Sequence, residues 1–303
     1  MSYDTNIPAS FPHQIATNWD LMTQQTQSVL ERTVTMAPHT GLTKQIKFGQ
    51  TFGSKAHTGR AEKVTPVEYL ANTRWQQVVF RDIADPIFID QWDETSLAEV
   101  ALPNSAAIQG FDAAYQRDKD DEIIAAITRN VYTGDVSPTI AVAFPSSTNS
   151  VAHGSTGLTA AKVSQIIRKM RLNNVNFDAG EVFGIITPYD EEYLLNNVAE
   201  VRSKDYSKVQ PIDGGSIANK SWMGINWVIS NRLPTDTSAH TVTNLFYTKA
   251  SILWNPGKRM VDVAKRADIS NATQISATWM FGATRREDAG VFTMSNLYTS
   301  TVV

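Results

Sequence analysis

The chain has 303 residues, of which 42% are hydrophobic and 19% charged, so it can fold around one large core or two smaller ones. Its formal net charge of -3 argues against a chain-wide nucleic-acid partner, because such domains are usually clearly basic. The absence of cysteine excludes disulfides, thiolate metal sites and cysteine nucleophiles. No signal-peptide pattern opens the chain and no run approaches ~20 apolar residues, so we expect neither secretion nor a membrane partner.

The first 38 residues are polar and include Pro8, Pro12 and Pro38, with a Gln/Thr-rich stretch at 23–27. Proline and polar residues without regular periodicity are typical of an extended segment with at most one short helix. We therefore predict an arm, and we expect another subunit to stabilise it.

Residues 41–67 alternate apolar and polar side chains before a glycine-rich stretch. Leu42, Ile46 and Phe48 share one parity, and glycines stand at positions 49, 53 and 59. This pattern predicts a long β-hairpin with a flexible tip. A two-stranded hairpin is marginally stable in water, so it needs a surface to lie on.

Charge is distributed unevenly between this hairpin and the segment that follows it. Residues 41–63 carry five basic side chains against one acid, a formal +4, whereas residues 82–122 carry eleven acids against two basic side chains, a formal -9. Both segments could be solvated surfaces, as blocks of like charge often are. Alternatively, the hairpin of one subunit lies on the acidic surface of its neighbour, where complementary charge sets register and partner choice. The candidate contact residues are Lys44, Lys47, Lys55, Arg60 and Lys63 on the basic side, and Asp82, Asp85, Asp118, Asp121 and Glu122 on the acidic side.

Residues 75–92 are rich in β-branched and aromatic side chains and are interrupted by Asp85 and Pro86, which predicts a strand, a bend and a second strand. From Asn104, a good helix cap, apolar residues recur at helical spacing as far as Arg129. A helix of about 25 residues would be ~37 Å long, which is unusual in a globular domain.

The remainder of the chain predicts helices that alternate with strands and then strands alone, so the fold class is α+β. A connector rich in Ser, Thr, Asn, Gly and Pro at 138–157 marks a subdomain border. The predicted elements are a helix at 158–172, a strand at 182–186, a helix at 190–198, and strands at 225–230, 244–254, 274–283 and 290–298.

The helix at 158–172 carries Lys162, Arg168, Lys169 and Arg171 and no acid. A solvated helix face explains these charges best, although they could also face phosphate or the acids of a neighbour. The acids at 190–192 open the next helix, where negative charge is favoured by the helix macrodipole.

Sequence motifs that would carry chemistry are absent. The chain has no phosphate-binding loop, no dinucleotide-binding fingerprint and no nucleophile elbow. Its five histidines lack metal-ligand spacing, and the acids at 118–122 have no glycine turn of the kind that calcium loops use. We therefore predict a protein without catalytic, cofactor-binding or metal sites, and not an enzyme.

Several segments follow one another in a characteristic order: the hairpin 41–66, the run 74–80 with 82–86, the helix 104–129, the glycine-to-Leu-Pro strand segment 223–234, and the segments 246–251 and 279–286. This order resembles the major capsid proteins of tailed bacteriophages, which have the Hong Kong 97-type fold. The resemblance covers nearly the whole chain and consists of organisation and weak local patterns.

The resemblance implies a structural subunit that self-assembles into hexamers and pentamers of an icosahedral head enclosing double-stranded DNA. It also implies a place in the virion capsid, assembly in the bacterial host cytoplasm, a portal and a separate scaffolding protein as partners, and weak non-specific contact with DNA. The implied domains are an N-terminal arm (1–38), an extended hairpin or E-loop (39–72), a peripheral domain (73–150) with its spine helix at 104–129, an axial domain (151–254), and C-terminal strands that return to the peripheral domain (255–303).

Two other functions stay open on the sequence. Another phage structural subunit, from the tail tube or the head decoration, would form a tube or ring in place of a closed shell. A carbohydrate-acting hydrolase would need two acids facing a cleft, and Asp82 with Asp85 is the pair that we would nominate.

Overall fold

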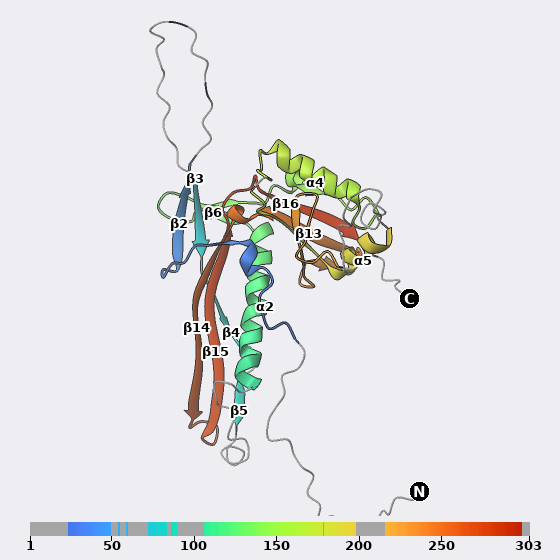
Figure 1. Ribbon diagram of the computed structural model, residues 1–303. Coiled ribbons are helices and arrows are strands. Elements are labelled where there is room, and N and C mark those ends of the chain that lie inside the picture. The colour runs from blue at the N-terminus through green and yellow to red at the C-terminus, as the bar shows by residue number, and fades with distance from the viewer. Residues whose placement is uncertain are drawn as a thin grey trace, which may run out of the picture. The chain divides into compact units, whose positions relative to one another are not determined.

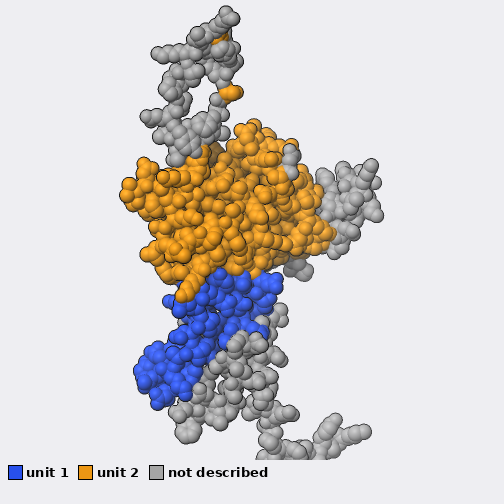
Figure 2. Space-filling view, turned by 60° about the vertical axis from the view of Figure 1, so that its left-hand side comes forward, with its two compact units in different colours: residues 1–27, 81–116, 259–279 blue, residues 28–80, 117–258, 280–303 orange. Residues whose placement is uncertain are grey.

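The computed structural model describes residues 24–49, 54, 59, 72–83, 86–89, 106–177, 179–197 and 216–298. The chain divides into two compact units (Figure 2). Unit 1 comprises residues 1–27, 81–116 and 259–279, and unit 2 comprises residues 28–80, 117–258 and 280–303.

One sheet of unit 2 contains seven of the described strands: β8 (Ser150–Val151), β9 (Val182–Ile186), β10 (Ser221–Trp222), β11 (Ile225–Ile229), β12 (Thr235–Asp236), β13 (Thr241–Thr248) and β16 (Val291–Leu297). Their order is β10-β11-β9-β13-β16-β8, with β12 paired to β13. β9 runs parallel to β11 and β16 runs parallel to β8, whereas β13 is antiparallel to both β9 and β16. The sheet is therefore mixed, with β13 near its centre.

Helix α4 (Ala160–Leu172) packs on this sheet (Figure 1). Its buried residues Val163, Ile166 and Met170 lie three and four positions apart, which places them on one helix face. They share a core with Trp227 and Phe246 of the sheet, and all five side chains are fully buried. Burial of a large aliphatic side chain contributes ~1.5–3 kcal/mol, so this face holds α4 on the sheet.

Capping explains where the helices of this region begin. The Thr159 side chain accepts a hydrogen bond from the backbone N–H of Lys162 at the start of α4. Thr187 does the same for Asp190 in α5 (Pro188–Asn197), whose first residue is a proline, a residue well suited to that position. A single turn, α3 (Ser146–Asn149), precedes β8.

The other described strands form two smaller sheets. One contains β1 (Thr35–Met36), β14 (Ile252–Arg266), β15 (Ala272–Arg285) and β4 (Val79–Asp82) in that order, with β5 (Ile87–Ile89) also paired to β15. The other has the order β2 (Thr43–Phe48), β3 (Asn72–Gln77), β6 (Val131–Thr133) and β7 (Ile140–Val142). Single 3₁₀ turns, η1 (Glu31–Thr33) and η2 (Lys249–Ser251), precede β1 and β14.

Helix α2 (Ala106–Thr128) confirms the long helix predicted at 104–129. Its 23 residues span ~35 Å. Asn104, the predicted cap, lies outside the described residues. Within unit 2, Ile123 and Ile127 of this helix are fully buried.

Most other predicted elements are confirmed to within two residues at each end: the helices at 158–172 and 190–198 and the strands at 182–186, 225–230, 274–283 and 290–298. β2 confirms the first strand of the hairpin predicted at 41–67, and the second strand predicted near Val64 and Val67 lies outside the described residues. The described partner of β2 is β3, which lies beyond the predicted range and pairs antiparallel from Thr43 opposite Gln77 to Phe48 opposite Asn72. The bend at Asp85 lies outside the described residues.

The single strand predicted at 244–254 is wrong. β13 ends at Thr248, η2 turns the chain, and β14 begins at Ile252 in a different sheet. The turn is held by the Thr248 and Ser251 hydroxyl oxygens, 2.6 Å apart, and by the Lys249 N–H, which donates to the Glu181 carbonyl at 2.9 Å. No glycine or proline interrupts these residues, so their pattern does not reveal the turn.

The continuous strand expected from Trp75 to Phe80 is also wrong. The chain leaves β3 after Gln77 and enters β4 at Val79, and these strands belong to different sheets. Val78, between them, donates its N–H to the carbonyl oxygen of Leu42 at 2.9 Å. No glycine or proline stands between Trp75 and Phe80, and both strands contain aromatic residues that favour β-structure, so the local sequence does not mark the change of sheet.

The last strand departs from the expected assignment of residues 255–303 to the peripheral domain. β14 and β15 share a sheet with β4, but β16 pairs with β13 and β8 in the seven-stranded sheet. The domain boundaries themselves stay a prediction.

Candidate inter-subunit contact site

The described part of the hairpin places two of the five basic candidates. Lys44 and Lys47 lie on β2, opposite Gln76 and Thr73 of β3. Lys47 is exposed, whereas Lys44 is half-buried with its Nζ 3.5 Å from the carbonyl oxygen of Pro38. The other three candidates, Lys55, Arg60 and Lys63, lie outside the described residues.

Four of the five acidic candidates are described, and they lie on two elements. Asp82 is exposed on β4, and Asp118 is half-buried on α2. Asp121 and Glu122 follow on the same helix. Asp85 lies outside the described residues, so the structure does not describe where it lies relative to Asp82.

Asp121 and Glu122 have partners within their own chain. Arg232 donates through Nε to Oδ1 of Asp121 at 2.5 Å and through Nη2 to Oδ2, and this hydrogen bonding raises the pKa of Arg232. Glu122 is only 3% exposed, and its Oε1 accepts a hydrogen bond from Nη2 of Arg129 at 2.6 Å. The expected solvated acidic surface is therefore wrong at Glu122. Contact of the other acids with a neighbour stays a prediction.

Asp120, which we did not nominate from the sequence, holds the root of the arm. Its carboxylate is fully buried and accepts hydrogen bonds from the Ser28 hydroxyl at 2.5 Å and from the N–H groups of Val29 at 3.1 Å and Leu30 at 3.2 Å. A buried carboxylate needs such donors because an unpaired buried charge is costly. Asp120 therefore fixes residues 28–30 on α2.

Neighbouring contacts reinforce this attachment. Lys119, which is 4% exposed, donates from Nζ to Oε2 of Glu31 at 2.7 Å. The hydroxyl oxygens of Thr33 and Tyr247 lie 2.5 Å apart, and burial raises the pKa of the Tyr247 phenol above its ordinary value. Because Tyr247 belongs to β13, the arm root is tied to the seven-stranded sheet as well as to α2.

Lys162 corrects the interpretation of α4 as a solvated basic helix. It is 7% exposed, and its Nζ donates to the carbonyl oxygens of Thr156 at 2.7 Å and Gly157 at 3.0 Å. Lys169 also binds its own chain, donating to the carbonyl oxygens of Thr148 and Ser150. The expected solvated face is therefore wrong at both lysines, while Arg168 and Arg171 are exposed.

A buried polar network joins this lysine to the start of α5. Lys162 Nζ also donates to Oδ1 of Asn296 at 3.1 Å, and Asn296 Nδ2 donates to Oδ1 of Asp190 at 2.8 Å. Asn244 donates to the second carboxylate oxygen of Asp190 at 2.8 Å. Burial lowers the pKa of Lys162 and raises the pKa of Asp190. The network ties both helices to β13 and β16.

The described residues offer no group of three or more His, Cys, Asp or Glu side chains that could hold a metal ion. No helix within the same ranges is long and apolar enough to cross a membrane. The contacts of Asp120, Lys119 and Lys162 described above join helices and strands of the same chain.

A family model for phage capsid protein matches residues 7–297. The chain belongs to the phage capsid protein family. No curated protein matches the chain. For this capsid protein, the family favours a structural shell subunit over a tail-tube or decoration subunit and over a hydrolase.

Solved capsid structures share the fold of this capsid protein at low sequence identity. The cyanophage Pam1 capsid is 12% identical with a TM-score of 0.70, covering 99% of this chain and 100% of that chain. The capsid of Ralstonia phage GP4 is 8% identical with a TM-score of 0.67, covering 100% of both chains. A Mycobacterium phage Che8 chain is 15% identical with a TM-score of 0.64, covering 94% of this chain and 98% of that chain. The capsid protein therefore has the α+β, Hong Kong 97-type fold that its sequence resembles. Its family makes it a structural capsid protein of the virion.

Proposed function

We propose that this capsid protein forms hexamers and pentamers that close into an icosahedral head around double-stranded DNA, in the cytoplasm of the bacterial host. The attachment of residues 28–30 to the buried Asp120 carries the proposal. Residues 28–30 are attached at the same place in every subunit. We therefore expect the residues that precede them to contact a neighbour in the same way each time. Repeated head-to-tail contacts close into rings when the rotation between subunits closes and form open filaments when it does not, and the proposed hexamers and pentamers are the closed case.

The hairpin supplies the second contact of the proposal. Lys47 is exposed on β2, and Asp82 is exposed on β4. We expect the basic hairpin to lie on the acidic surface of a neighbour, where Asp82, Asp85, Asp118 and Asp121 are its candidate partners. Complementary charge there would set register more than affinity.

Further partners follow from the same proposal. A portal and a separate scaffolding protein would direct closure of the head. The net charge of -3 favours only weak, non-specific contact with the packaged DNA.

Sedimentation velocity with negative-stain microscopy tests the assembly proposal. The chain would be expressed alone and then together with the phage genes that neighbour its own. Closed particles or ring-shaped capsomers are the expected result. A chain that stays monomeric under both conditions would contradict the proposal.

Substitution of the described hairpin lysines tests the charge contact. Lys44→Gln with Lys47→Gln should leave the free energy of unfolding unchanged within ~0.5 kcal/mol, because both side chains lie at least partly in solvent. Particle yield should fall. The matched control is Lys258→Gln, a lysine that is exposed on β14. Equal particle yields from the double variant and the control would exclude a specific role for these lysines.

A further inference from the structure

The backbone attaches the hairpin to the rest of unit 2 through little pairing. β3 pairs with β2 along its full length, but the described register between β3 and β6 consists of Trp75 opposite Tyr132. A single pair permits pivoting about that point. Side chains must therefore set the direction of the hairpin.

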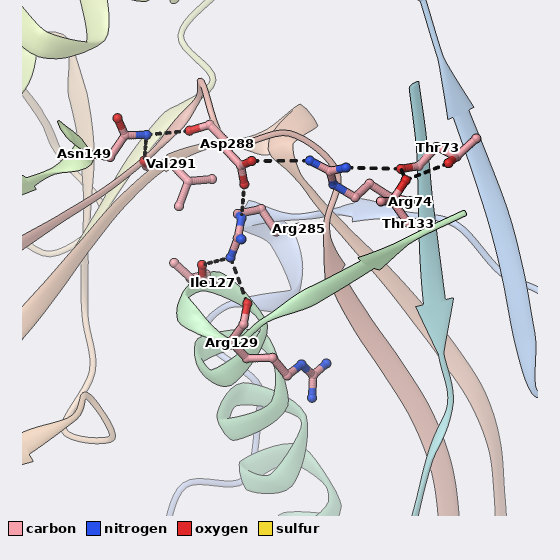
Figure 3. Close-up of polar contacts among 9 residues, drawn as sticks. All are labelled: Thr73, Arg74, Ile127, Arg129, Thr133, Asn149, Arg285, Asp288 and Val291. Atoms are coloured by element: carbon pink, nitrogen blue, oxygen red, sulfur yellow. Dashed lines mark hydrogen bonds and ion pairs between the residues drawn. The ribbon is translucent and has the colours of Figure 1, made fainter. Parts of the chain in front are cut away.

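Side chains of β3 alternate between two faces, and each face has its own contacts. On one face, Trp75 Nε1 donates to the Gly134 carbonyl at 2.8 Å, and the hydroxyl oxygens of Thr73 and Thr133 lie 2.8 Å apart. On the other face, Arg74 Nη2 donates to Oδ2 of Asp288 at 3.3 Å (Figure 3), and the fully buried Gln76 donates from Nε2 to the Gly282 carbonyl at 2.9 Å. The first face binds the end of β6 and the residue after it, and the second binds β15 and the turn between β15 and β16.

Asp288 is also linked to the C-terminal end of α2, through Arg285. Its Oδ1 accepts a hydrogen bond from Nε of Arg285 at 2.5 Å. Arg285 is fully buried, and its Nη1 donates to the carbonyl oxygens of Ile127 at 2.8 Å and Arg129 at 3.0 Å (Figure 3). A helix leaves its last carbonyls without partners and favours positive charge there, so Arg285 is well placed.

The backbone of the same turn is held independently of the carboxylate. Asn149 Nδ2 donates to the carbonyl oxygens of Asp288 at 2.7 Å and Val291 at 3.0 Å. Removal of the negative charge from Asp288 would therefore leave the turn in place. Loss of this charge would remove the link between the Arg74 guanidinium on β3 and the Arg285 guanidinium, which binds the C-terminal end of α2.

We propose that the Asp288 carboxylate is a positioning group for assembly: it bridges Arg74 and Arg285 and so sets the direction of hairpin β2–β3 relative to the C-terminal end of α2. The inference rests on the proposed function, in which this hairpin reaches a neighbouring subunit. Gly134 and Thr133 fix one face of β3. On the other face, Gly282 holds Gln76 near the end of the strand, and Asp288 holds Arg74 two residues earlier. Loss of the bridge lets the part of the hairpin beyond Gln76 pivot, and fewer hairpins then meet the neighbour in register.

Hydrogen exchange of the full-length, unassembled chain tests this role with Asp288→Asn. Amides at 43–48 and 72–77 should exchange about tenfold faster than in wild type, which corresponds to ~1.4 kcal/mol of lost protection. Amides of β13 and α4 should keep their wild-type rates. Asp268→Asn, which breaks an exposed pair with Arg266, is the matched control and should change neither region.

A second variant covers the case in which Asp288→Asn fails to fold. Arg74→Gln leaves the buried pair between Arg285 and Asp288 intact and should show the same local loss of protection. Unchanged exchange at the hairpin root would overturn the proposal, and so would an equal increase across β13 and α4, since that is general destabilisation.

Assembly assays then separate this inference from the proposed function. If wild type forms particles and the variants form fewer, with faster exchange confined to the hairpin root, both proposals are supported. If wild type forms particles and the variants match it in yield, the positioning role is refuted alone. If wild type forms none, the proposed function fails, while the exchange data still decide whether Asp288 holds the hairpin.

Discussion

Asp120→Ala would remove the buried carboxylate that fixes the arm root. Wild-type Asp120 accepts three hydrogen bonds, two of them from the backbone N–H groups of Val29 and Leu30. Alanine offers no acceptor, and the arm root would have to detach or leave those donors unsatisfied. The substitution therefore acts on the attachment and on the stability of the fold together.

The expected loss follows from the contacts. Each hydrogen bond to a charged group contributes ~1.5–3 kcal/mol, and such contributions do not add fully when they share one acceptor. We expect the free energy of unfolding to fall by about 3 kcal/mol, roughly a hundredfold in the ratio of folded to unfolded chain. The neighbouring pair of Lys119 with Glu31 remains and limits the loss.

Urea titration of the unassembled chain measures this loss as a lower midpoint with an unchanged slope. Asp112→Ala is the matched control on the same helix, because the Asp112 side chain is 45% exposed and its pair with Arg259 should contribute less than ~1 kcal/mol. A double-mutant cycle of Asp120→Ala with Ser28→Ala should give a coupling of about 1 kcal/mol. If Asp120→Ala costs no more than the control, the reasoning about the buried carboxylate is refuted.

Four further predictions concern the fold itself, and urea unfolding checks each. Gly257 has a φ of +58°, and an added Cβ would lie 1.8 Å from a carbonyl oxygen of β15, so Gly257→Ala should cost at least ~2 kcal/mol. Gly110 lies within α2 with open space around it, so Gly110→Ala should stabilise the chain by ~0.5–1 kcal/mol. Burial raises the pKa of Asp190 above its ordinary 3.8, so the stability that this group contributes is present below that value and is lost as pH rises through the folded-state pKa. The difference in unfolding free energy between wild type and Asp190→Asn should therefore be larger at about pH 4 than at about pH 7. Alanine variants of Arg232 and Asp121 should show a coupling of only ~0.5–1 kcal/mol that shrinks in high salt, because both side chains are partly exposed.

Periodicity predicted those elements whose apolar residues face a single core. Val163, Ile166 and Met170 lie on one side of α4, and their spacing alone places the helix. Periodicity failed where the chain changes sheet without changing composition, as at Thr248 to Ile252. Hydrogen bonds to distant residues hold that turn, such as the one that Lys249 N–H donates to the Glu181 carbonyl, and the local sequence does not reveal them.

The candidate site divides in the same way. The hairpin lysines are visible in the sequence as a block of charge. The buried Asp120 can be recognised only by its spacing from the apolar residues of the same helix. It lies three, four and seven positions before the buried Ile123, Ile124 and Ile127, on the apolar face of α2. An acid at such a position needs internal donors. That reasoning nominates Asp120 from the sequence, although it does not show that the donors come from the arm.

Consecutive acids on α2 also show why a charge total over a segment overstates the acidic surface. Each residue turns the helix by about 100°, so Asp120, Asp121 and Glu122 face three directions. Asp120 meets the arm root, Asp121 meets Arg232, and Glu122 meets Arg129. Together with Asp112, which pairs with Arg259, at least four of the eleven acids counted in this segment are thus already bound inside the chain, which leaves less negative charge for a neighbour than the formal -9 suggests. The hairpin lysines should therefore be tested first against the exposed Asp82, where charge reversal cannot disturb a buried pair. Asp82→Lys should lower particle yield, and reversal of Lys47 in the same chain should restore part of it if the two side chains meet across the subunit boundary.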